Sequence, residues 1–332
     1  MTLTSQLTLS GAPARVLWRV RAVARKLAGA LLTLFVSTFA VFAALAAAPG
    51  DPAIALAGRR PTPERLAQIH QELGLDRPLP VRYLDWLAGL PHGDLGQSIV
   101  YKGSNVADLL APRLGTTLFL VVYAALIILV LGLALGILGG AFRRLNGAVA
   151  VITSVGVAIP GFVATSVLVS VFALGLGWFP AVGAGSGFAD QLWHLTLPAL
   201  ALAIGWCAWL AQMTRTEIRA EKAREHVETA YGRGLSPARV FRRHVLRNAA
   251  IPITTVFGLT VAGLLAGAAV VEQAFGIDGL GTLMLRSVTS KDYNVVLAVA
   301  SLIILAFVVS TQVVDACHTL LDPRLRKNGG RP

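Results

Sequence analysis

The five lysines of this 332-residue chain are its first candidates for chemistry, because a phosphate-binding loop ends in glycine, lysine and then serine or threonine. In such a loop, backbone amides and the lysine ammonium hold the phosphates of a nucleotide. No lysine here follows a glycine or precedes a serine or threonine; the five are Lys26, Lys102, Lys222, Lys291 and Lys327. We therefore predict that the chain binds no cofactor itself and holds neither ATP nor magnesium.

Motifs for nucleophilic or metal-assisted catalysis are also missing from the sequence. It has no Gly-x-Ser-x-Gly turn to present a serine and no His-Glu-x-x-His pair to hold zinc. The two cysteines, Cys207 and Cys317, and the six histidines do not fall at the spacing of metal ligands. We therefore predict that the chain is not an enzyme and has neither catalytic residues nor a metal site.

Long apolar segments dominate the chain instead. Charged residues make up 14% of it, whereas soluble domains have about 25%. A membrane-spanning helix needs about 20 apolar residues. Six runs without Asp, Glu, Lys or Arg each hold at least one such span: 27–50, 114–142, 145–189, 191–214, 248–271 and 293–314. The sequence therefore predicts an all-α, polytopic membrane bundle of six transmembrane helices. The first helix, 27–48, is expected to be retained, because the apolar part of a signal peptide has only about 7–15 residues.

The net charge of +12 follows the predicted topology. Residues 1–26 carry +5, 142–147 carry +2, 214–250 carry +5 and 319–332 carry +3, whereas the alternate connections are nearly neutral. Excess Lys and Arg mark the cytoplasmic side of a membrane protein. We therefore expect a basic cytoplasmic N-terminal segment, 1–26, a basic cytoplasmic tail, 319–332, and an outer loop, 49–113. This pattern explains the positive charge by the orientation of the chain in the lipid bilayer. We therefore expect no nucleic acid as a partner.

Ionisable residues are almost absent from the middle of the predicted spans. Ion-coupled transporters usually keep such residues inside their helices, so the energy for transport would come from a partner. In the long run 145–189, we expect a helix that kinks at Pro160 and ends near Gly177, with a re-entrant segment as the alternative. The candidates for the wall of a substrate pathway are Pro160, Phe162 and Glu272, because a kink or a charge near a span end often faces a cavity.

Glycines at four-residue spacing favour close helix packing in the membrane. They are Gly132, Gly136 and Gly140 in the second span, and Gly263 and Gly267 in the fifth. The outer loop is also expected to fold. Thr62 and Pro63 can begin a helix that Gly74 ends, and a second short helix is expected over 81–90.

The cytoplasmic loop 214–250 has the pattern of a docking element. An apolar helical stripe is formed by Val227, Ala230, Tyr231, Gly234 and Leu235. Ala230 and Gly234 are small, so a partner surface could approach closely. Ser236 and Pro237 can begin a second helix, with arginines around an apolar face. The pattern leaves open whether this element docks a partner or packs on its own bundle and on lipid headgroups.

This loop resembles the EAA loop of ABC importer permeases. The pattern Glu-Ala-Ala, three residues and Gly is matched by Glu228-Thr229-Ala230 and Gly234. Over about 20–326, the chain resembles the dipeptide/oligopeptide/nickel-type permease family. The further segments that carry the resemblance are 48–52 (APGDP), 72–80 (ELGLDRPLP), 93–96 (GDLG), 159–162 (IPGF), 243–252 (RHVLRNAAIP), 271–276 (VEQAFG) and 321–326 (LDPRLR).

The resemblance implies a type I ABC importer permease fold, with a core permease domain over 114–318, in the inner membrane of a bacterium. It implies import of di- or oligopeptides, or alternatively of a nickel chelate, glutathione or another small solute. The implied partners are a second homologous permease, one or two ABC ATPase subunits that hold ATP and magnesium, and an external substrate-binding (lipo)protein. The residues expected to couple the chain to the ATPase are Glu228, Ala230, Tyr231, Gly234, Arg242 and Arg243, with Glu228 anchoring the loop.

Two other classes of protein remain open on the residues alone. A self-contained secondary transporter or channel would show ionisable groups in mid-helix, and a membrane anchoring protein would bind a cytoplasmic partner without moving a substrate. The apolar spans disfavour the first class, and the breadth of the resemblance disfavours the second.

Overall fold

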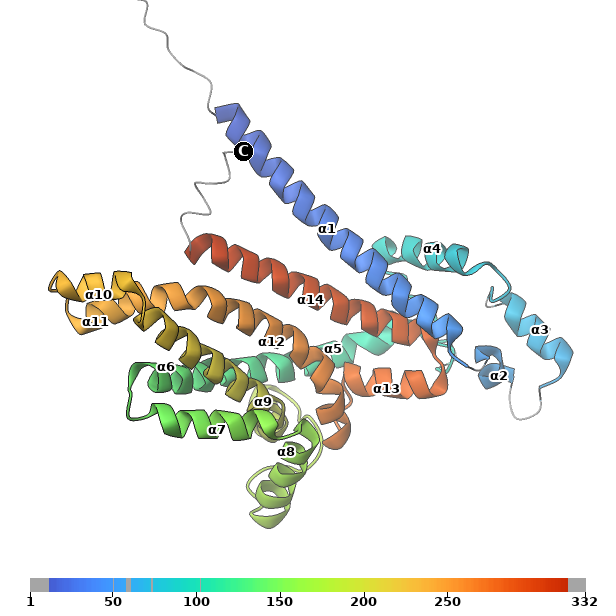
Figure 1. The fold of residues 1–332 in the computed structure, drawn as a ribbon. Helices are drawn as coiled ribbons and strands as arrows, with labels where there is room; N and C mark the ends of the chain where they lie inside the picture. The colour runs from blue at the N-terminus through green and yellow to red at the C-terminus, as the bar shows by residue number, and fades with distance from the viewer. Residues whose placement is uncertain (1–11, 50, 58–60, 73, 102, 322–332) are drawn as a thin grey trace, which may run out of the picture.

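The computed structural model describes residues 12–321 apart from 50, 58–60, 73 and 102. This part of the chain is helical, and Figure 1 shows most of its long helices running roughly lengthwise between two ends. Among the described residues, five helices are long and apolar enough to cross a membrane, and a sixth crossing exists if one bent pair counts as a span. The predicted all-α bundle of membrane helices is thus confirmed. The residues after 321, and with them most of the predicted basic tail, lie outside the described residues.

The helix α1 (Ala12–Ala47) begins well before the predicted span and includes most of the basic N-terminal segment. It packs against α14 (Tyr293–Leu321), and Lys26 donates to Asp315 at 2.8 Å near one end of this pair. Most of the apolar part of α1 is exposed in the isolated chain. Such a surface is stable where lipid or another apolar surface covers it.

The helix α9 (Phe188–Lys222) forms the centre of the bundle. It contacts α5 (Val106–Ile127), α6 (Leu133–Ala141), α7 (Asn146–Ala158), α8 (Gly161–Leu168) and α12 (Arg247–Ala274). Of the five candidate spans it is both the most buried and the least apolar. These properties are compatible, because a helix surrounded by protein needs small side chains for packing rather than a lipid-facing surface.

The glycines at four-residue spacing in the second predicted span lie at the contact with α9. The continuous helix formed by α5, the π-helical turn η2 (Ile128–Gly132) and α6 presents its glycines to α9. A Cβ at Gly132 would lie 3.1 Å from Leu210, and one at Gly140 would lie 2.8 Å from Ile218. The backbones therefore approach more closely than any larger residue would allow.

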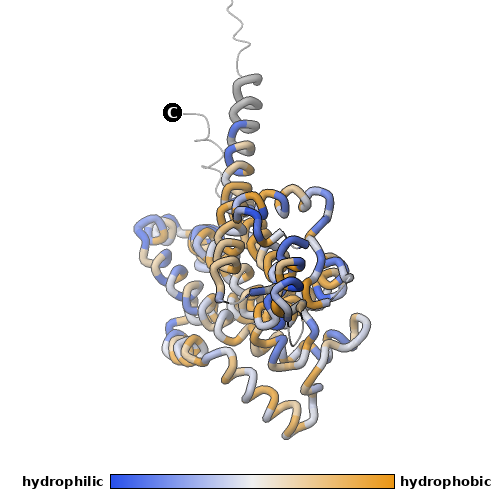
Figure 2. Tube along the Cα trace, turned by 90° about the vertical axis from the view of Figure 1, so that its right-hand side faces the viewer, coloured by the Kyte–Doolittle hydropathy of each residue, from blue (hydrophilic) through white to orange (hydrophobic). Residues whose placement is uncertain are grey.

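The helix predicted over most of 145–189 is broken rather than merely kinked. The helix α7 ends at Ala158, and α8 continues through the π-helical segment η3 (Val169–Gly175) at an angle of 98° to it. Pro160 is the residue before α8 and has extended backbone angles. The bend is thus at the predicted residue, and both a broken span and a re-entrant segment fit it. Figure 2 shows apolar residues along the α8–η3 arm, which projects from the lowest part of the molecule.

The loop 49–113, predicted to lie outside, is folded as predicted. It contains α2 (Pro52–Ala57), α3 (Pro63–Glu72), α4 (Leu79–Gly89) and the short turn η1 (Leu90–His92). The Thr62 hydroxyl accepts a hydrogen bond from the Arg65 amide at 3.3 Å, and Gly74 has a φ of +61°. Both observations match the predicted start and end of α3.

Two clusters attach this loop to the bundle. Tyr83 of α4 is buried among Phe35, Phe39 and Phe42 of α1. The second cluster surrounds the buried Asp292 carboxylate, which accepts from the Ser98 hydroxyl and from the amides of residues 99 and 100. The loop is therefore held both to α1 and to the turn between α13 (Leu280–Ser290) and α14.

Replacing Tyr83 by phenylalanine is expected to lower stability modestly. The Tyr83 hydroxyl donates to the Phe35 carbonyl at 2.9 Å and lies 2.8 Å from the Thr38 hydroxyl. Removing it should cost about 1–2 kcal/mol, because typical hydrogen bonds contribute about 1 kcal/mol each. The thermal unfolding midpoint in detergent would report the change. Tyr101→Phe is the control, because Tyr101 is exposed; equal midpoints for the two variants would contradict a stabilising role for the Tyr83 hydroxyl.

Candidate coupling element and pathway cavity

A compact helical corner forms one end of the bundle, at the left of Figure 1. It consists of α10 (Glu225–Gly232), a turn, α11 (Pro237–Val240) and the π-helical segment η4 (Phe241–Leu246), which continues directly into α12. Ser236 precedes α11 and Pro237 is its first residue, as predicted. A displacement of this corner would therefore pass into α12 without an intervening flexible loop.

Gly234 makes the turn between α10 and α11 possible. Its φ of +76° is a conformation that glycine adopts without strain, and residues with a Cβ rarely do. A Cβ at this position would meet no atom within 4 Å. Within the chain, the glycine is thus required by the backbone turn rather than by close packing, and the predicted close approach of a partner remains a proposal.

Ala230 faces the interior of the corner. It is buried together with Val227, and both belong to the same apolar cluster as Val240 and Val245. In this conformation its side chain is therefore covered by the chain's own residues. Ala230 was predicted to let a partner surface approach closely, and its buried position does not match that prediction. A helical stripe can pack inward or outward, and only the fold selects between these two orientations.

Glu221, rather than the predicted Glu228, anchors the corner. The nearly buried Glu221 carboxylate accepts from the Asn248 amide at 2.7 Å and lies 3.1 Å from His226 Nε2 and 3.3 Å from Arg224 Nε. It thereby joins the end of α9 to the starts of α10 and α12. Glu228 is exposed in the first turn of α10, where its negative charge interacts favourably with the helix dipole. Its side chain makes no hydrogen bond or ion pair within the described residues.

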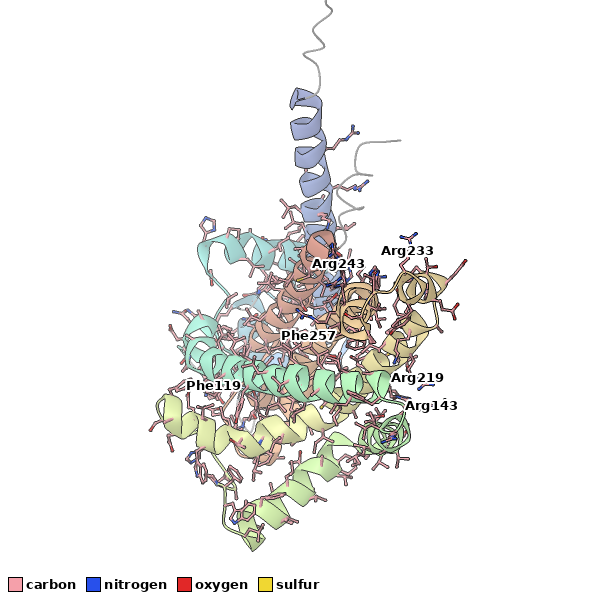
Figure 3. The ribbon with its side chains drawn as sticks, turned by 90° about the vertical axis from the view of Figure 1, so that its left-hand side faces the viewer. Phe119, Arg143, Arg219, Arg233, Arg243 and Phe257 are labelled. Carbon is pink, nitrogen blue, oxygen red and sulfur yellow. The ribbon has the colours of Figure 1, made fainter. Side chains whose placement is uncertain are left out.

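The outer surface of this end is basic. Tyr231, Arg242 and Arg243 are exposed there. Figure 3 shows Arg143, Arg219, Arg233 and Arg243 along the same end of the bundle, and all four are exposed. Lys222 donates to the Ala141 carbonyl at 3.0 Å, which ties this surface to the end of α6. The arrangement presents a positively charged face that includes the exposed aromatic side chain of Tyr231.

An apolar cavity of about 480 Å³ lies beside the bend between α7 and α8. Ile159, Gly161 and Phe162, which flank or follow Pro160, contribute to its lining, and Phe162 is 64% exposed. The opposite wall comes from α9 and α12 and includes Trp206, Trp209, Gly267 and Val270. The predicted region around Pro160 and Phe162 thus borders a cavity.

Two tryptophans in this wall were not among the predicted site residues. Trp206 and Trp209 make an edge-on ring contact at 5.5 Å. The Trp206 ring lies against α12 at Gly263, where a Cβ would come within 2.6 Å of the indole. A signal existed in the sequence, because tryptophans in membrane helices usually lie near the interfaces and this pair falls in the middle of an apolar run.

Glu272 does not face this cavity. It is fully buried near the end of α12, where its carboxylate accepts from the Thr117 hydroxyl at 2.6 Å and from the Thr282 amide at 3.0 Å. Thr117 in turn accepts from the Leu280 amide at 2.9 Å. Both amides belong to the first turn of α13, where backbone N–H groups have no hydrogen-bond acceptor inside the helix. Glu272 was predicted to lie in the wall of a pathway. In this conformation it instead holds α13 to α5 and α12.

Known proteins resemble this chain in sequence and in fold. A family model described as "Binding-protein-dependent transport system inner membrane component" matches residues 128–327, and the model of the N-terminal part of such components matches 19–117. A chain of the inward-facing MetNI methionine ABC transporter has a TM-score of 0.51 at 19% identity, covering 63% of this chain and 95% of that one. This likeness shows the shared fold.

Curated relatives cover nearly the whole chain. The probable peptide ABC transporter permease protein y4tP of Sinorhizobium fredii is 33% identical over 92% of this chain and 98% of its own. The oligopeptide transport system permease protein AppB of Bacillus subtilis is 32% identical, over 87% and 93%. The glutathione transport system permease protein GsiC of Escherichia coli is 35% identical, over 92% and 98%. The chain therefore belongs to the binding-protein-dependent transport system inner membrane component family, the non-catalytic permease subunits of ABC importers.

Proposed function

We propose that this chain forms half of the membrane pathway of an ABC importer for peptides. The proposal rests on one observation. The helix α12 joins an exposed basic corner at one end of the bundle to an apolar cavity deeper in it. The peptide and glutathione permeases among its relatives support a peptide as the substrate. Glutathione, itself a tripeptide, is the second candidate on the strength of the 35% identical relative.

The partners follow from the same proposal. A second permease completes the pathway, ABC ATPase subunits contact the α10–α11 corner, and an external binding protein delivers the peptide at the opposite end. This arrangement places the basic corner and both termini in the cytoplasm of a bacterium, in agreement with the positive charge of these segments. Closure of the ATPases pushes the corner, and the continuous η4–α12 helix transmits the push to the cavity wall.

The proposal is tested by reconstituting the chain with its second permease, ATPases and binding protein in proteoliposomes. ATP-dependent uptake of a tripeptide such as trialanine is the expected result. Uptake by the purified chain alone would indicate a self-contained transporter. Binding of the ATPases without uptake of trialanine or glutathione would contradict peptide import.

Replacing Gly234 by valine is expected to uncouple this complex. A β-branched residue at a φ of +76° costs on the order of 1–3 kcal/mol, so the turn should change and the corner should shift. Peptide-stimulated ATP hydrolysis and uptake should fall by about ten-fold or more, while assembly of the complex persists. Gly232→Ala is the matched control, because Gly232 ends α10 at a position with open space and without a positive φ. Normal stimulation and uptake in Gly234→Val would refute the role of this turn.

A further inference from the structure

The apolar cavity beside the bend between α7 and α8 has the size and the lining of a site for a small apolar group. Its volume of about 480 Å³ lies within the range of about 300–1,000 Å³ that small-molecule sites occupy. Among the described residues, every one that lines it is glycine, aliphatic or aromatic. A charged ligand group would lose its hydration there without gaining an ion pair. The cavity therefore favours an uncharged, apolar part of a ligand.

Two aromatic rings of α9 form part of one wall. The rings of Trp206 and Trp209 contact each other edge-on, with their centroids 5.5 Å apart. The Trp206 ring also lies against α12, because a Cβ at Gly263 would come within 2.6 Å of it. This packing holds the Trp206 ring, which in turn supports the ring of Trp209. The pair is therefore an aromatic wall that exists before a ligand enters.

The opposite wall contains an aromatic ring that has no aromatic neighbour. Phe162 of α8 lines the cavity and is 64% exposed. Its ring makes no contact with another aromatic ring among the described residues. Aromatic rings attract one another edge to face or in offset stacks, at centroid distances of about 4.5–7 Å. A large apolar side chain in the cavity would therefore have aromatic rings on two sides.

Gly205 leaves space in the cavity next to the tryptophans. A Cβ at this position would meet only the Gly156 carbonyl oxygen among the described residues, at 4.0 Å, and Gly205 has no positive φ. Packing and backbone geometry would thus both permit a larger residue. Glycine in the middle of a helix is also less stable than alanine. Neither packing nor helix stability explains this glycine, whereas an open cavity beside Trp206 does.

We propose that this cavity binds an apolar side chain of the peptide substrate, with Trp206 and Trp209 as the specificity-determining residues. The inference rests on the proposed function and names the part of the peptide that the membrane subunit recognises. Tryptophans of membrane helices are enriched at the interfaces, whereas this pair lies within the apolar run 191–214 and borders a cavity. A lipid acyl chain, which has no ring to pair with the aromatic walls, is the alternative occupant and an outcome of the test.

The test measures the rate of uptake of alanyl-phenylalanyl-alanine divided by that of trialanine in the reconstituted complex. Trp209→Ala is expected to lower this ratio about ten-fold, which is the scale of burying one large apolar side chain. Trp209→Phe, which keeps an aromatic ring, should give an intermediate ratio. The binding protein is the same in every arm, so its own selectivity cancels in the comparison of variant with wild type.

Gly205→Leu tests the same site by filling it. The added side chain should compete with the phenylalanyl side chain for space and lower the ratio about ten-fold, which is the scale of overpacking an apolar site. Gly115→Leu is the matched control, because a Cβ at Gly115 also meets open space and this residue lies outside the cavity. Equal ratios for Gly205→Leu and Gly115→Leu would overturn the proposal.

Trp193→Ala is the matched control for Trp209→Ala, because Trp193 lies in the same helix, is exposed and does not line the cavity. Equal ratios for these two variants would overturn the proposal, and this is the result expected if a lipid chain fills the cavity. An equal loss of uptake for both peptides in Trp209→Ala would also overturn it and would leave the tryptophans a packing role. Failure of the wild-type complex to move either peptide would instead refute peptide import itself, so the two failures are distinguishable.

Discussion

Replacing Gly136 by alanine is expected to prevent α6 from packing against α9. The added Cβ would overlap the Thr214 side chain and would lie 2.8 Å from the Ala211 carbonyl oxygen, which belongs to backbone and cannot rotate away. Both helices would have to separate, and the neighbouring contacts of Gly132 and Gly140 would be lost with them. Overpacking of this kind costs about 1–3 kcal/mol, with more when backbone must move. The unfolding midpoint and the yield of monodisperse protein in detergent would measure it.

Gly115→Ala is the matched control for this variant. Gly115 lies in α5, which precedes η2 and α6 in the same continuous helix, and a Cβ there would meet no atom within 4 Å. Alanine has the higher helix propensity, so this substitution should leave stability unchanged or raise it slightly. A Gly136→Ala protein as stable as Gly115→Ala would show that the two helices can separate without loss.

Replacing Glu272 by alanine is expected to release α13 from the bundle. The substitution leaves the Thr117 hydroxyl and the Thr282 amide without their acceptor in a buried site. Each unsatisfied buried donor costs about 1–3 kcal/mol, so the total loss should be about 2–6 kcal/mol. The unfolding midpoint should fall, and amide hydrogens of 280–290 should exchange with solvent faster than in the wild type.

Two variants separate this effect from a general loss of charge. Glu72→Ala removes an exposed carboxylate from α3 and should leave both measurements unchanged. Glu272→Gln keeps an acceptor oxygen and should fall between the wild type and Glu272→Ala. Unchanged exchange over 280–290 in Glu272→Ala would contradict the anchoring of α13 by this carboxylate.

The sequence alone located the α10–α11 corner closely but misplaced the carboxylate that anchors it. Pro237 begins α11 directly after Ser236, because the fixed φ of proline suits the first turn of a helix and this signal acts within one turn. The anchoring carboxylate was expected at Glu228 and is found at Glu221. The difference depends on Asn248, which lies 27 residues along the chain and reaches Glu221 because α12 packs against α9.

The bend between α7 and α8 shows the same limit. The bend at Pro160 follows from the missing amide hydrogen of proline and was predictable at that residue. Its angle of 98° was not, because the angle depends on how α8 packs against α9 and α12.

By itself, the sequence determined that this is a helical, multi-spanning membrane protein and where its spans and its basic corner lie. Hydropathy, charge asymmetry and helix capping act over one span or less, so they can be recognised from the order of residues along the chain. Only the tertiary structure decided that Ala230 faces inward and that Glu272 holds α13. Each of these depends on contacts between residues that are distant in sequence, and no local pattern specifies which of them come together.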